Sequence, residues 1–440
     1  MFPKKIFSLK KKENQEVYRL AFTFFGIPVF KINKKYRQKT TKFYVLGLPV
    51  FKIKDKGIFR RFYLFNIYIW KRNLFKNIPI PQEERLILFF DYLENDKDAI
   101  SVDSWTFFEW LREKGVPSKY VVCKNNTAMF QSAKQSRFSK DIIMLDNCQD
   151  FVRICHDDIC KSNFILTSFG CGPFDETLMQ IPYLKHIFID HGVALLKENV
   201  TGLSLYNEGK FNHRLVPTRL TAELYQQKQV WQGRQITVGL PRWDKLRPVS
   251  HPSRNIFISF TWRRNLKENL LALRNYQKQI FEFLTDQKFT ELLSKYNVNI
   301  NIALHHALIQ QGESIEIPPM INLISSEDIA EIKGQTDLFI TDYSSLMFDF
   351  MFLDIPVISY RFDADCPYLD ESDKIDAVSA KSHDSELYNI FYNKENAVKK
   401  IEYYITHNFE LEESYKKINA SLWWEKENIC EHLYEKIKDL

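Results

Sequence analysis

Apolar and polar positions alternate differently in two parts of the chain. From about residue 85 onward, apolar runs of strand length are separated by longer stretches with helical spacing of apolar side chains. Short buried strands alternating with helices are typical of parallel α/β sheets. The apolar runs form two series that divide near residue 240, which predicts two Rossmann-like halves. Strands are expected at Leu86–Phe90, Tyr120–Cys123, Ile142–Leu145, Phe164–Thr167, Ile187–Asp190, Ile256–Phe260, Val298–Leu304, Leu338–Thr341 and Pro356–Tyr360.

Helical spacing appears between these strands and again at the end of the chain. The expected helices are Trp105–Lys114, Thr221–Gln229, Lys267–Lys295 and Ser344–Leu353. The tail from about Asp384 has mixed charge and helical spacing, and is interpreted as a closing element.

An internal repeat comes before this α/β region. Phe24–Ile32 reads FFGIPVFKI, Val45–Ile53 reads VLGLPVFKI, and Leu64–Lys71 is a third copy without the Gly and Pro. Each full copy is a short β-prone run with a Gly-x-Pro turn. Basic strands with exposed aromatic side chains suit contact with a membrane surface or another polyanion. A small β-meander that merely packs on the main body is an equal alternative.

Charge separates the same two parts. Residues 1–80 hold 20 Lys and Arg against three acidic residues, so the other 360 residues carry 41 basic and 52 acidic groups. A basic arm on an acidic body indicates a surface for acidic lipid, an anionic polymer or nucleic acid. A solvated basic face without a partner is the simpler alternative.

Length and composition exclude several classes of protein. A chain of 440 residues with 45% hydrophobic residues and 13 Gly is neither globally disordered nor a glycine-rich repeat, and has room for two to three domains.

The seven cysteines include no CxxC pair, so we expect reduced, mostly buried thiols of a cytosolic protein. The N-terminus becomes basic again before an apolar core develops, and the longest apolar run, near Tyr63–Trp70, is too short to span a bilayer. Membrane contact is therefore expected to be peripheral.

The most informative segment is Asp337–Asp349, DLFITDYSSLMFD, in which a strand ends in Thr341-Asp342 and Ser344-Ser345 open a helix. Ligands of open α/β sheets bind at the carboxyl ends of strands, and a helix N-terminus offers free N–H groups to phosphate. Asp349 follows on the same helical face and could reach a ribose or polyol hydroxyl. An ordinary helix cap by Asp342 or Ser344 is the alternative.

Two histidines also follow predicted strands. His191-Gly192 comes after Ile187–Asp190, where glycine allows close approach of a ligand and histidine can accept a proton near neutral pH. His305, with His306, follows Val298–Leu304. A histidine held in a turn by its own hydrogen bonds is the structural alternative for each.

Arginines supply cations near other predicted strand ends. Arg242 lies in Gly239-Leu-Pro-Arg-Trp-Asp244, and Thr261-Trp-Arg263-Arg264 follows Ile256–Phe260. Guanidinium groups can bind phosphate oxygens in a forked geometry. The sequence has no Walker A loop, GxGxxG or HExxH motif. These residues together favour a substrate with a diphosphate, held without a dedicated metal cage.

In this order, the motifs resemble the CDP-glycerol glycerophosphotransferases, the family of teichoic-acid polymerases and primases. The resemblance covers about residues 160–365 and rests on five segments: His191-Gly192 with Lys197, Gly239-x-Pro241-Arg242-x-Asp244, Thr261-Trp262-Arg263, Leu304-His305, and Thr341–Ser345 with Phe348-Asp349. The Gly-x-Pro repeats also look like those that precede some bacterial surface-polysaccharide transferases.

The resemblance implies a GT-B-like α/β fold with two Rossmann-like domains facing a central cleft and a small basic β-rich N-terminal region. The expected divisions are 1–80 for the repeat region, 81–240 for the acceptor domain, and 241–440 for the CDP-donor domain with the closing helices. The expected reaction moves glycerol phosphate, or a related polyol phosphate, from CDP-glycerol to a lipid-linked or polymeric glycan and releases CMP.

By motif, the expected catalytic residues are His191, the base for the acceptor hydroxyl, and His305. Donor binding is expected from Gly192, Arg242, Thr261, Arg263, Thr341, Asp342, Ser344, Ser345 and Asp349. No metal ligand and no cofactor is firmly implied, although Asp342 or the diphosphate could recruit Mg²⁺. The expected location is the cytoplasmic side of the membrane, with residues 1–80 on its anionic surface and no nucleic acid bound.

Two other functions fit the same features. A GT-B glycosyltransferase could use another nucleotide sugar on this scaffold, because a fold does not fix a function. A polyanion-binding protein without activity could use the basic arm, with the α/β body as a scaffold.

Overall fold

The computed structural model describes most of the chain, and the statements below concern this part. It comprises residues 7–13, 17–24, 27–35, 40–46, 48–56, 59–73, 86–92, 101–190, 192–193, 211–228, 234–247, 253–261, 263, 266, 269–304, 320–324, 329–364, 387 and 389–440. The chain divides into two compact units. One consists of Met1–Arg85, Phe151–Asn163 and Pro173–Leu184, and the other of Leu86–Asp150, Phe164–Gly172 and Lys185–Leu440.

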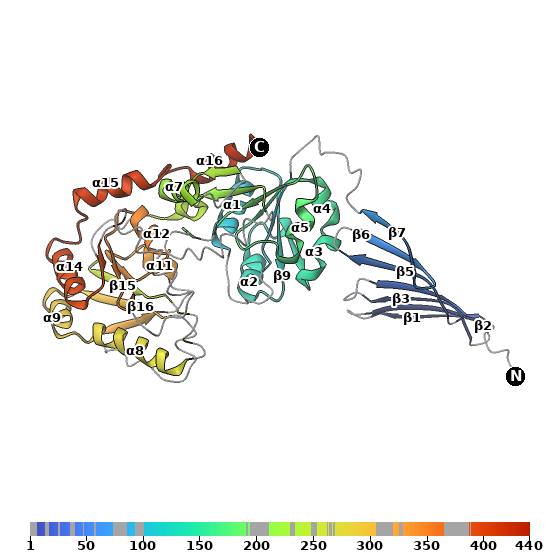
Figure 1. The fold of residues 1–440 in the computed structure, drawn as a ribbon, viewed down its shortest axis with the longest axis horizontal. Helices are drawn as coiled ribbons and strands as arrows, with labels where there is room; N and C mark the ends of the chain where they lie inside the picture. The colour runs from blue at the N-terminus through green and yellow to red at the C-terminus, as the bar shows by residue number, and fades with distance from the viewer. Residues whose placement is uncertain are drawn as a thin grey trace. The chain divides into compact units, whose positions relative to one another are not determined.

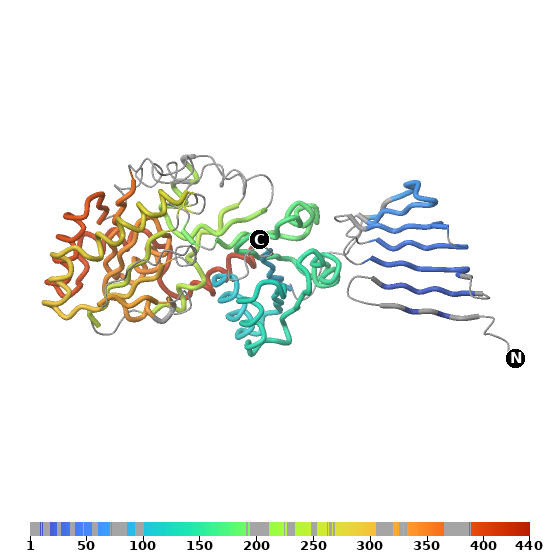
Figure 2. Tube along the Cα trace, turned by 90° about the horizontal axis from the view of Figure 1, so that it is seen from below, coloured from blue at the N-terminus to red at the C-terminus, as the bar shows by residue number. Residues whose placement is uncertain are grey.

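The repeat region forms a seven-stranded antiparallel sheet in which each strand pairs with the next in the chain (Figures 1 and 2). Its strands are β1 Phe7–Glu13, β2 Val17–Phe24, β3 Ile27–Lys35, β4 Thr40–Val45, β5 Leu48–Lys56, β6 Phe59–Leu64 and β7 Ile67–Asn73. The expected β structure is confirmed. The same unit also holds the short helices α3 Phe151–Ile154, α4 His156–Lys161 and α5 Asp175–Met179.

The backbone pairing of the strands explains why the Gly-x-Pro motif recurs. In β3 and β5 the register shifts beside Pro28 and Pro49, where proline cannot donate to the ladder. The carbonyl of Val29 accepts a hydrogen bond from the N–H of Leu46 in the next turn, at 2.9 Å. The carbonyl of Val50 accepts one from Phe65 in the turn after that, at 2.8 Å. Each copy thus supplies a bulge that binds the following hairpin.

The second unit contains two sheets with a Rossmann-like arrangement. The first has the order β10-β9-β8-β11-β12-β13-β14, and the second β17-β16-β15-β18-β19-β20. The pairings β10–β9–β8, β11–β12–β13–β14 and all those of the second sheet are parallel. The strand order reverses between β8 and β11 and between β15 and β18, so each sheet has a topological switch point.

The strands of the first sheet are β8 Leu86–Phe90, β9 Ser118–Cys123, β10 Ile142–Leu145, β11 Ser162–Thr167, β12 Lys185–Phe188, β13 His213–Val216 and β14 Arg234–Thr237. Those of the second are β15 Asn255–Ser259, β16 Asn299–Ala303, β17 Ile321–Ile324, β18 Leu338–Thr341, β19 Val357–Tyr360 and β20 Ile390–Phe391. Every strand predicted in the α/β region is present, with ends shifted by up to two residues.

The helices of the second unit include α1 Val102–Glu113, α2 Thr127–Gln135, α7 Arg219–Lys228, α8 Leu270–Leu284, α9 Gln287–Tyr296, α11 Ile329–Lys333, α12 Met347–Phe352, α14 Lys394–Thr406, α15 Glu413–Leu422 and α16 Ile429–Lys438. The expected single helix Lys267–Lys295 is two helices. The break occurs because the Asp286 side chain caps α9 by accepting from Phe289 N–H at 3.1 Å. Helix α12 starts at Met347 rather than Ser344, so both serines lie in the preceding turn.

The last two helices return to the first Rossmann-like half. Both oxygens of Asp244, in the 3₁₀ turn η4 Pro241–Lys245, accept hydrogen bonds from the first N–H groups of α16, Ile429 at 2.8 Å and Cys430 at 2.7 Å. Trp424 Nε1, between α15 and α16, donates to the Val216 carbonyl at the end of β13 at 2.9 Å. The tail therefore connects the end of the chain to the first half.

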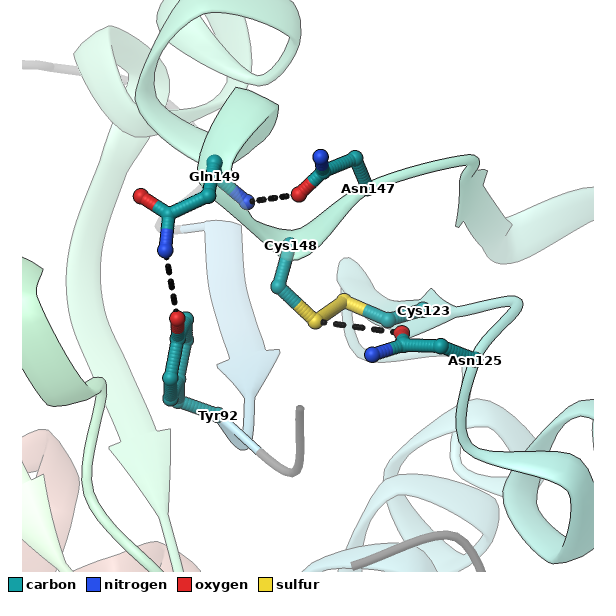
Figure 3. The surroundings of a disulfide bond; sticks show 6 residues. All are labelled: Tyr92, Cys123, Asn125, Asn147, Cys148 and Gln149. Atoms are coloured by element: carbon teal, nitrogen blue, oxygen red, sulfur yellow. Dashed lines mark hydrogen bonds between the residues drawn. A yellow bond between two sulfur atoms is a disulfide. The ribbon is translucent and has the colours of Figure 1, made fainter. Parts of the chain in front are cut away.

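The expectation that all cysteines are reduced thiols is wrong for one pair, Cys123 and Cys148, which form a disulfide (Figure 3). Cys123 ends β9 and Cys148 follows β10, and these are neighbouring parallel strands. Their carboxyl ends meet, which brings the two Cα atoms to 5.5 Å although 25 residues separate them in sequence. Beside them, Gln149 N–H donates to Asn147 Oδ1 at 2.8 Å and Gln149 Nε2 donates to Tyr92 Oη at 2.5 Å.

Among the described residues, no helix is both long enough and apolar enough to cross a bilayer.

Candidate functional site

The switch point of the second sheet brings two of the predicted motifs together. Thr261 follows β15 and Asp342 follows the neighbouring strand β18. The Thr261 N–H donates to Asp342 Oδ1 at 2.8 Å, and the N–H of Tyr343 donates to the same oxygen at 2.7 Å. Thr341 Oγ1 donates to the Ser259 carbonyl at 2.6 Å. The two loops therefore leave the sheet side by side, at the position where ligands of open α/β sheets bind.

Arg263 is held inside this junction by two carboxylates. Its Nη2 donates to Asp342 Oδ2 at 2.7 Å and to Asp363 Oδ1 at 3.0 Å, and its Nε donates to Asp363 Oδ2 at 2.8 Å. Its Nη1 donates to the Thr261 carbonyl at 2.8 Å. All three side chains are buried. Burial alone lowers the pKa of Arg263, but Asp363 and Asp342 outweigh it and raise that pKa well above its ordinary value.

This arrangement limits what Arg263 and Asp342 can offer to a ligand. Four of the five N–H donors of a guanidinium are engaged with the protein. Both oxygens of Asp342 accept from the protein, so a Mg²⁺ ion that used them would have to displace Arg263. Asp342 therefore does not fit the role of a magnesium ligand, and Arg263 fixes the shape of the loops.

Aromatic side chains surround the ion pair. The Tyr276 hydroxyl donates to the Thr261 carbonyl at 2.8 Å, and the Arg263 guanidinium lies 4.9 Å from the centre of the Tyr343 ring. Tyr343 is buried, and its hydroxyl has no hydrogen-bond partner within the part of the chain that the structure describes. The same holds for Thr261 Oγ1. A bound polar ligand or water would satisfy these two hydroxyls.

The Ser-Ser turn meets the His-Gly loop. A Cβ atom added to Gly192 would lie 2.9 Å from Ser345 Oγ and 3.4 Å from Ser345 Cβ. Gly192 follows β12 of the first sheet, whereas Ser345 follows β18 of the second. The structure thus brings together two motifs that are 153 positions apart. Ser344 and Ser345 are half-buried, and Ser344 Oγ accepts from Leu346 N–H at 3.3 Å.

Arg242 and Asp349 form the centre of a second buried network. Arg242 Nε lies 3.1 Å and 3.2 Å from the two Asp349 oxygens, and Nη2 lies 2.9 Å from Oδ1. Trp243 Nε1 donates to the same Oδ1 at 2.8 Å, and Lys333 Nζ donates to Oδ2 at 2.7 Å. On its other side Arg242 pairs with Asp103 of α1, whose Oδ1 accepts from the Arg242 N–H at 3.0 Å.

The charges of this network are fixed by their neighbours. Burial raises the pKa of Asp349, but Arg242 and Lys333 outweigh that effect and hold the pKa below its ordinary value. Burial also raises the pKa of Asp103, and Arg242 opposes this only in part. Asp349 uses its oxygens on three protein partners, so its carboxylate is not open to a hydroxyl of a ligand. Any effect of Asp349 and Arg242 on donor binding would therefore act through the position of α12 and its preceding turn.

Two predicted site residues, His191 and His305, lie outside the described residues. In sequence His191 stands between Asp190 and Gly192, which are both described. Asp190 is buried and accepts from Arg214 Nη2 at 2.6 Å.

Sequence reasoning missed four residues that build these networks: Asp91, Asp103, Lys333 and Asp363. Asp91 follows β8 directly, and Oδ1 accepts from Thr167 Oγ1, Ser168 N–H and Phe169 N–H at 2.7, 2.6 and 2.9 Å. A polar residue at the end of an apolar run is the same signal that identified Asp342, so it could have identified Asp91 and, three residues after β19, Asp363. Asp103 and Lys333 lie on helices with ordinary charge patterns and carry no such signal.

The fold and site define a class of protein. Two Rossmann-like parallel sheets with polar groups at their switch points constitute a GT-B-like α/β fold. The chain resembles a solved structure of the wall teichoic acid polymerase TagF with a TM-score of 0.51 at 13% identity, covering 81% of this chain and 90% of that one. It resembles a putative UDP-N-acetylglucosamine 2-epimerase from Listeria monocytogenes with a TM-score of 0.50 at 15% identity, covering 81% and 96%. The predicted fold class is confirmed.

Residues 159–423, more than half of the chain, match the model of the CDP-Glycerol:Poly(glycerophosphate) glycerophosphotransferase family. The chain belongs to this family, as its motifs predicted.

Two characterised relatives come from Bacillus. The minor teichoic acid biosynthesis protein GgaB of Bacillus subtilis is 23% identical over 255 residues, which are 53% of this chain and 26% of GgaB. The teichoic acid glycerol-phosphate primase of Bacillus spizizenii is 28% identical over 92 residues, 21% of this chain and 24% of the primase. The chain thus matches about a quarter of the length of each relative.

Proposed function

We propose that this protein transfers glycerol phosphate, or a related polyol phosphate, from CDP-glycerol to a teichoic-acid-like or capsular polymer and releases CMP. Family membership supports the reaction class. The observation that carries the proposal is the contact between Gly192 and Ser345, because it joins the loop of the proposed base to the turn proposed to bind phosphate. A solved TagF variant was soaked with CDPG, and it has the same fold.

The proposed step is a displacement at phosphorus. His191 takes the proton of the acceptor hydroxyl, and the resulting oxygen attacks the phosphorus that carries the glycerol. The bond from this phosphorus to the bridging oxygen breaks, and CMP leaves with that oxygen. Such reactions depend mainly on positioning and on neutralising the phosphate oxygens.

The described residues supply the positioning. The hydroxyls of Ser344 and Ser345, which are half-buried, and those of Thr261 and Tyr343 would hold the diphosphate. Arg263 keeps the two loops in place through Asp342 and Asp363. Thr341 fixes the end of β18. His305 would contribute a further cation or hydrogen-bond donor to the diphosphate.

The acceptor is proposed to be a lipid-linked or polymeric glycan. The enzyme would then work at the cytoplasmic face of the membrane, bound peripherally. The N-terminal basic sheet is the candidate for that contact, since it carries most of the excess positive charge.

The test is CMP release from CDP-glycerol by the full chain, with and without a lipid-linked glycan extract. His191→Ala should abolish acceptor-dependent release, while His407→Ala, a change on the exposed C-terminal end of α14, should leave it unchanged. Release of UDP from UDP-sugars without CMP release from CDP-glycerol would instead favour a glycosyltransferase. Absence of turnover with every nucleotide donor would favour a polyanion-binding protein without activity.

A further inference from the structure

Every second turn of the N-terminal sheet lies at the same end, because the strands are antiparallel and paired in chain order. The turns β4–β5 and β6–β7 lie at this end, and the described residues of these two turns are named here the hairpin edge. The N–H of Leu46 in the β4–β5 turn donates to Val29 of β3, and the N–H of Phe65 in the β6–β7 turn donates to Val50 of β5. Each of these two turns is therefore fixed to the strand that precedes its hairpin.

The hairpin edge exposes large apolar side chains. In the β4–β5 turn Leu46 is 69% exposed and Leu48 65%, and in the β6–β7 turn Phe65 is 60% exposed and Ile67 72%. Leu46 and Phe65 have φ values of 48° and 49°, in the left-handed region that favours Gly and Asn. Large apolar residues thus occupy positions where a polar residue would suit the backbone better, and their side chains contact little of the sheet.

The side chains change in kind with distance from the hairpin edge. Two residues from the turns stand Tyr44, Tyr63 and Tyr68, and Tyr63 pairs with Tyr68 across the strands. Four residues from the turns stand Lys42 and Arg61, and Lys42 pairs with Lys52. A strand rises about 3.3 Å per residue, so within each hairpin the apolar, tyrosine and basic levels are roughly 7 Å apart along the strands. Successive hairpins are stepped, because Lys52 of β5 pairs directly with Tyr63 of β6.

We propose that the hairpin edge inserts into the surface of an anionic lipid bilayer. Apolar tips would enter the boundary of the acyl chains, tyrosines would lie at headgroup depth, and lysine and arginine would meet the lipid phosphates. Lys52 Nζ lies 4.1 Å from the ring centre of Tyr63, its cross-strand partner, so the basic side chains of one hairpin lie beside the tyrosines of the next. The proposal deepens the proposed function, and rests on it only for the lipid-linked nature of the acceptor.

The order of the three levels favours a bilayer over other partners. Nucleic acid would meet the basic level alone, and exposed leucine and isoleucine tips would contribute nothing to phosphate contacts. A second copy of the chain would repeat the same basic level opposite itself, which repels. A bilayer presents apolar, interfacial and anionic layers in the same order as each of the two hairpins.

The test uses the full chain with phosphatidylcholine vesicles, with and without phosphatidylglycerol, in a flotation assay. The double variant Leu46→Asn, Phe65→Asn removes the apolar tips while asparagine suits the left-handed backbone. The matched control is Leu271→Gln on α8, since Leu271 is 62% exposed. Binding to the phosphatidylglycerol vesicles should fall by about tenfold or more in the double variant and remain in the control.

Each other outcome overturns the inference. Equal vesicle binding by wild type and double variant would place the contact elsewhere. Binding to heparin or RNA without vesicle binding would assign the sheet to another polyanion, and self-association lost in the double variant without lipid would assign it to a second copy. CMP release is measured on the same samples, so a failure of the proposed transferase reaction is seen separately from a failure to bind vesicles.

Discussion

Replacing Asp349 by asparagine removes one charge from the network between the two Rossmann-like halves and keeps the side-chain shape. Asp349 accepts from Arg242, Trp243 and Lys333 and is buried. In the variant, an amide N–H₂ must face one of these donors, and two partly buried cations, Arg242 and Lys333, lose part of their charge compensation. Breaking a buried ion pair from one side costs about 3–5 kcal/mol. We expect the free energy of unfolding to fall by about this amount.

The matched control is Asp354→Asn, five residues further along. Asp354 pairs with Lys426 at the surface and has a φ of 57°, which asparagine adopts readily. Exposed pairs contribute about 0–1 kcal/mol, so the control should lose no more than that. Urea unfolding, followed by fluorescence and circular dichroism, compares both variants with wild type. Equal stability of the Asp349 and Asp354 variants would refute the assignment of Asp349 as a buried charge centre.

The pH dependence gives a second check of the same variant. The folded pKa of Asp349 lies below its ordinary value, because Arg242 and Lys333 outweigh the effect of burial. The stability contributed by a carboxylate of this kind is present above the unfolded pKa and is lost as pH falls through the folded one. The difference between wild type and Asp349→Asn should therefore stay constant from about pH 5 to 8 and shrink only below about pH 4. A difference that shrinks near neutral pH would contradict the charge assignment.

Three further predictions address the loop contact, a buried histidine and the disulfide. Gly192→Ala should lower CMP release with little change in stability. It should lower CMP release less when introduced into Ser345→Ala than into wild type, because the oxygen 2.9 Å from the added Cβ is then absent; additive losses in CMP release would show that the contact does not limit the site. Burial, with two nearby cations, lowers the pKa of His213 from 6.5 to about 4. The neutral imidazole is therefore favoured in the folded state. The free energy of unfolding should fall by at most about 3 kcal/mol between pH 6.5 and pH 4, and it should fall less in His213→Phe. Identical pH profiles of unfolding for the variant and wild type would refute this prediction. Replacing both Cys123 and Cys148 by serine should lower the free energy of unfolding by about 3 kcal/mol for a bridge of this loop length, measured against untreated and reduced wild type; no loss relative to the oxidised protein would indicate that the bridge does not stabilise it.

The strands that could be predicted from sequence are those formed by nearly continuous apolar runs. LILFF at β8 and LFIT at β18 read as strands because continuous apolar runs of this length have few alternatives. The missed strands β13, HRLV, and β14, RQIT, are short and mix charged and apolar residues, so no period is visible. Their position in the sheet comes from the pairing of β13 with β12 and of β14 with β13, which are tertiary interactions.

The pairing of Arg242 with Asp349 could not be predicted from the sequence, also because it is a tertiary interaction. Each residue lies in a motif that sequence analysis identified, but 107 positions separate them. Charge pairing at this distance follows from how α12 and η4 pack, and local pattern carries no information about that. Sequence reasoning therefore treated both residues as open to a ligand, although each one compensates the other.

At both switch points an aspartate carboxylate binds the loop that follows the neighbouring strand. Asp91 after β8 and Asp342 after β18 each accept backbone N–H groups from the loop of the neighbouring strand, Ser168 in one case and Thr261 in the other. These carboxylates hold diverging loops together, and both are saturated by protein donors. We therefore propose that chemistry at the carboxyl ends of the sheets comes from other groups, such as the Ser345 hydroxyl beside Gly192 and the proposed base His191. For this reason a change at His191, and not at Asp342, separates loss of catalysis from loss of structure.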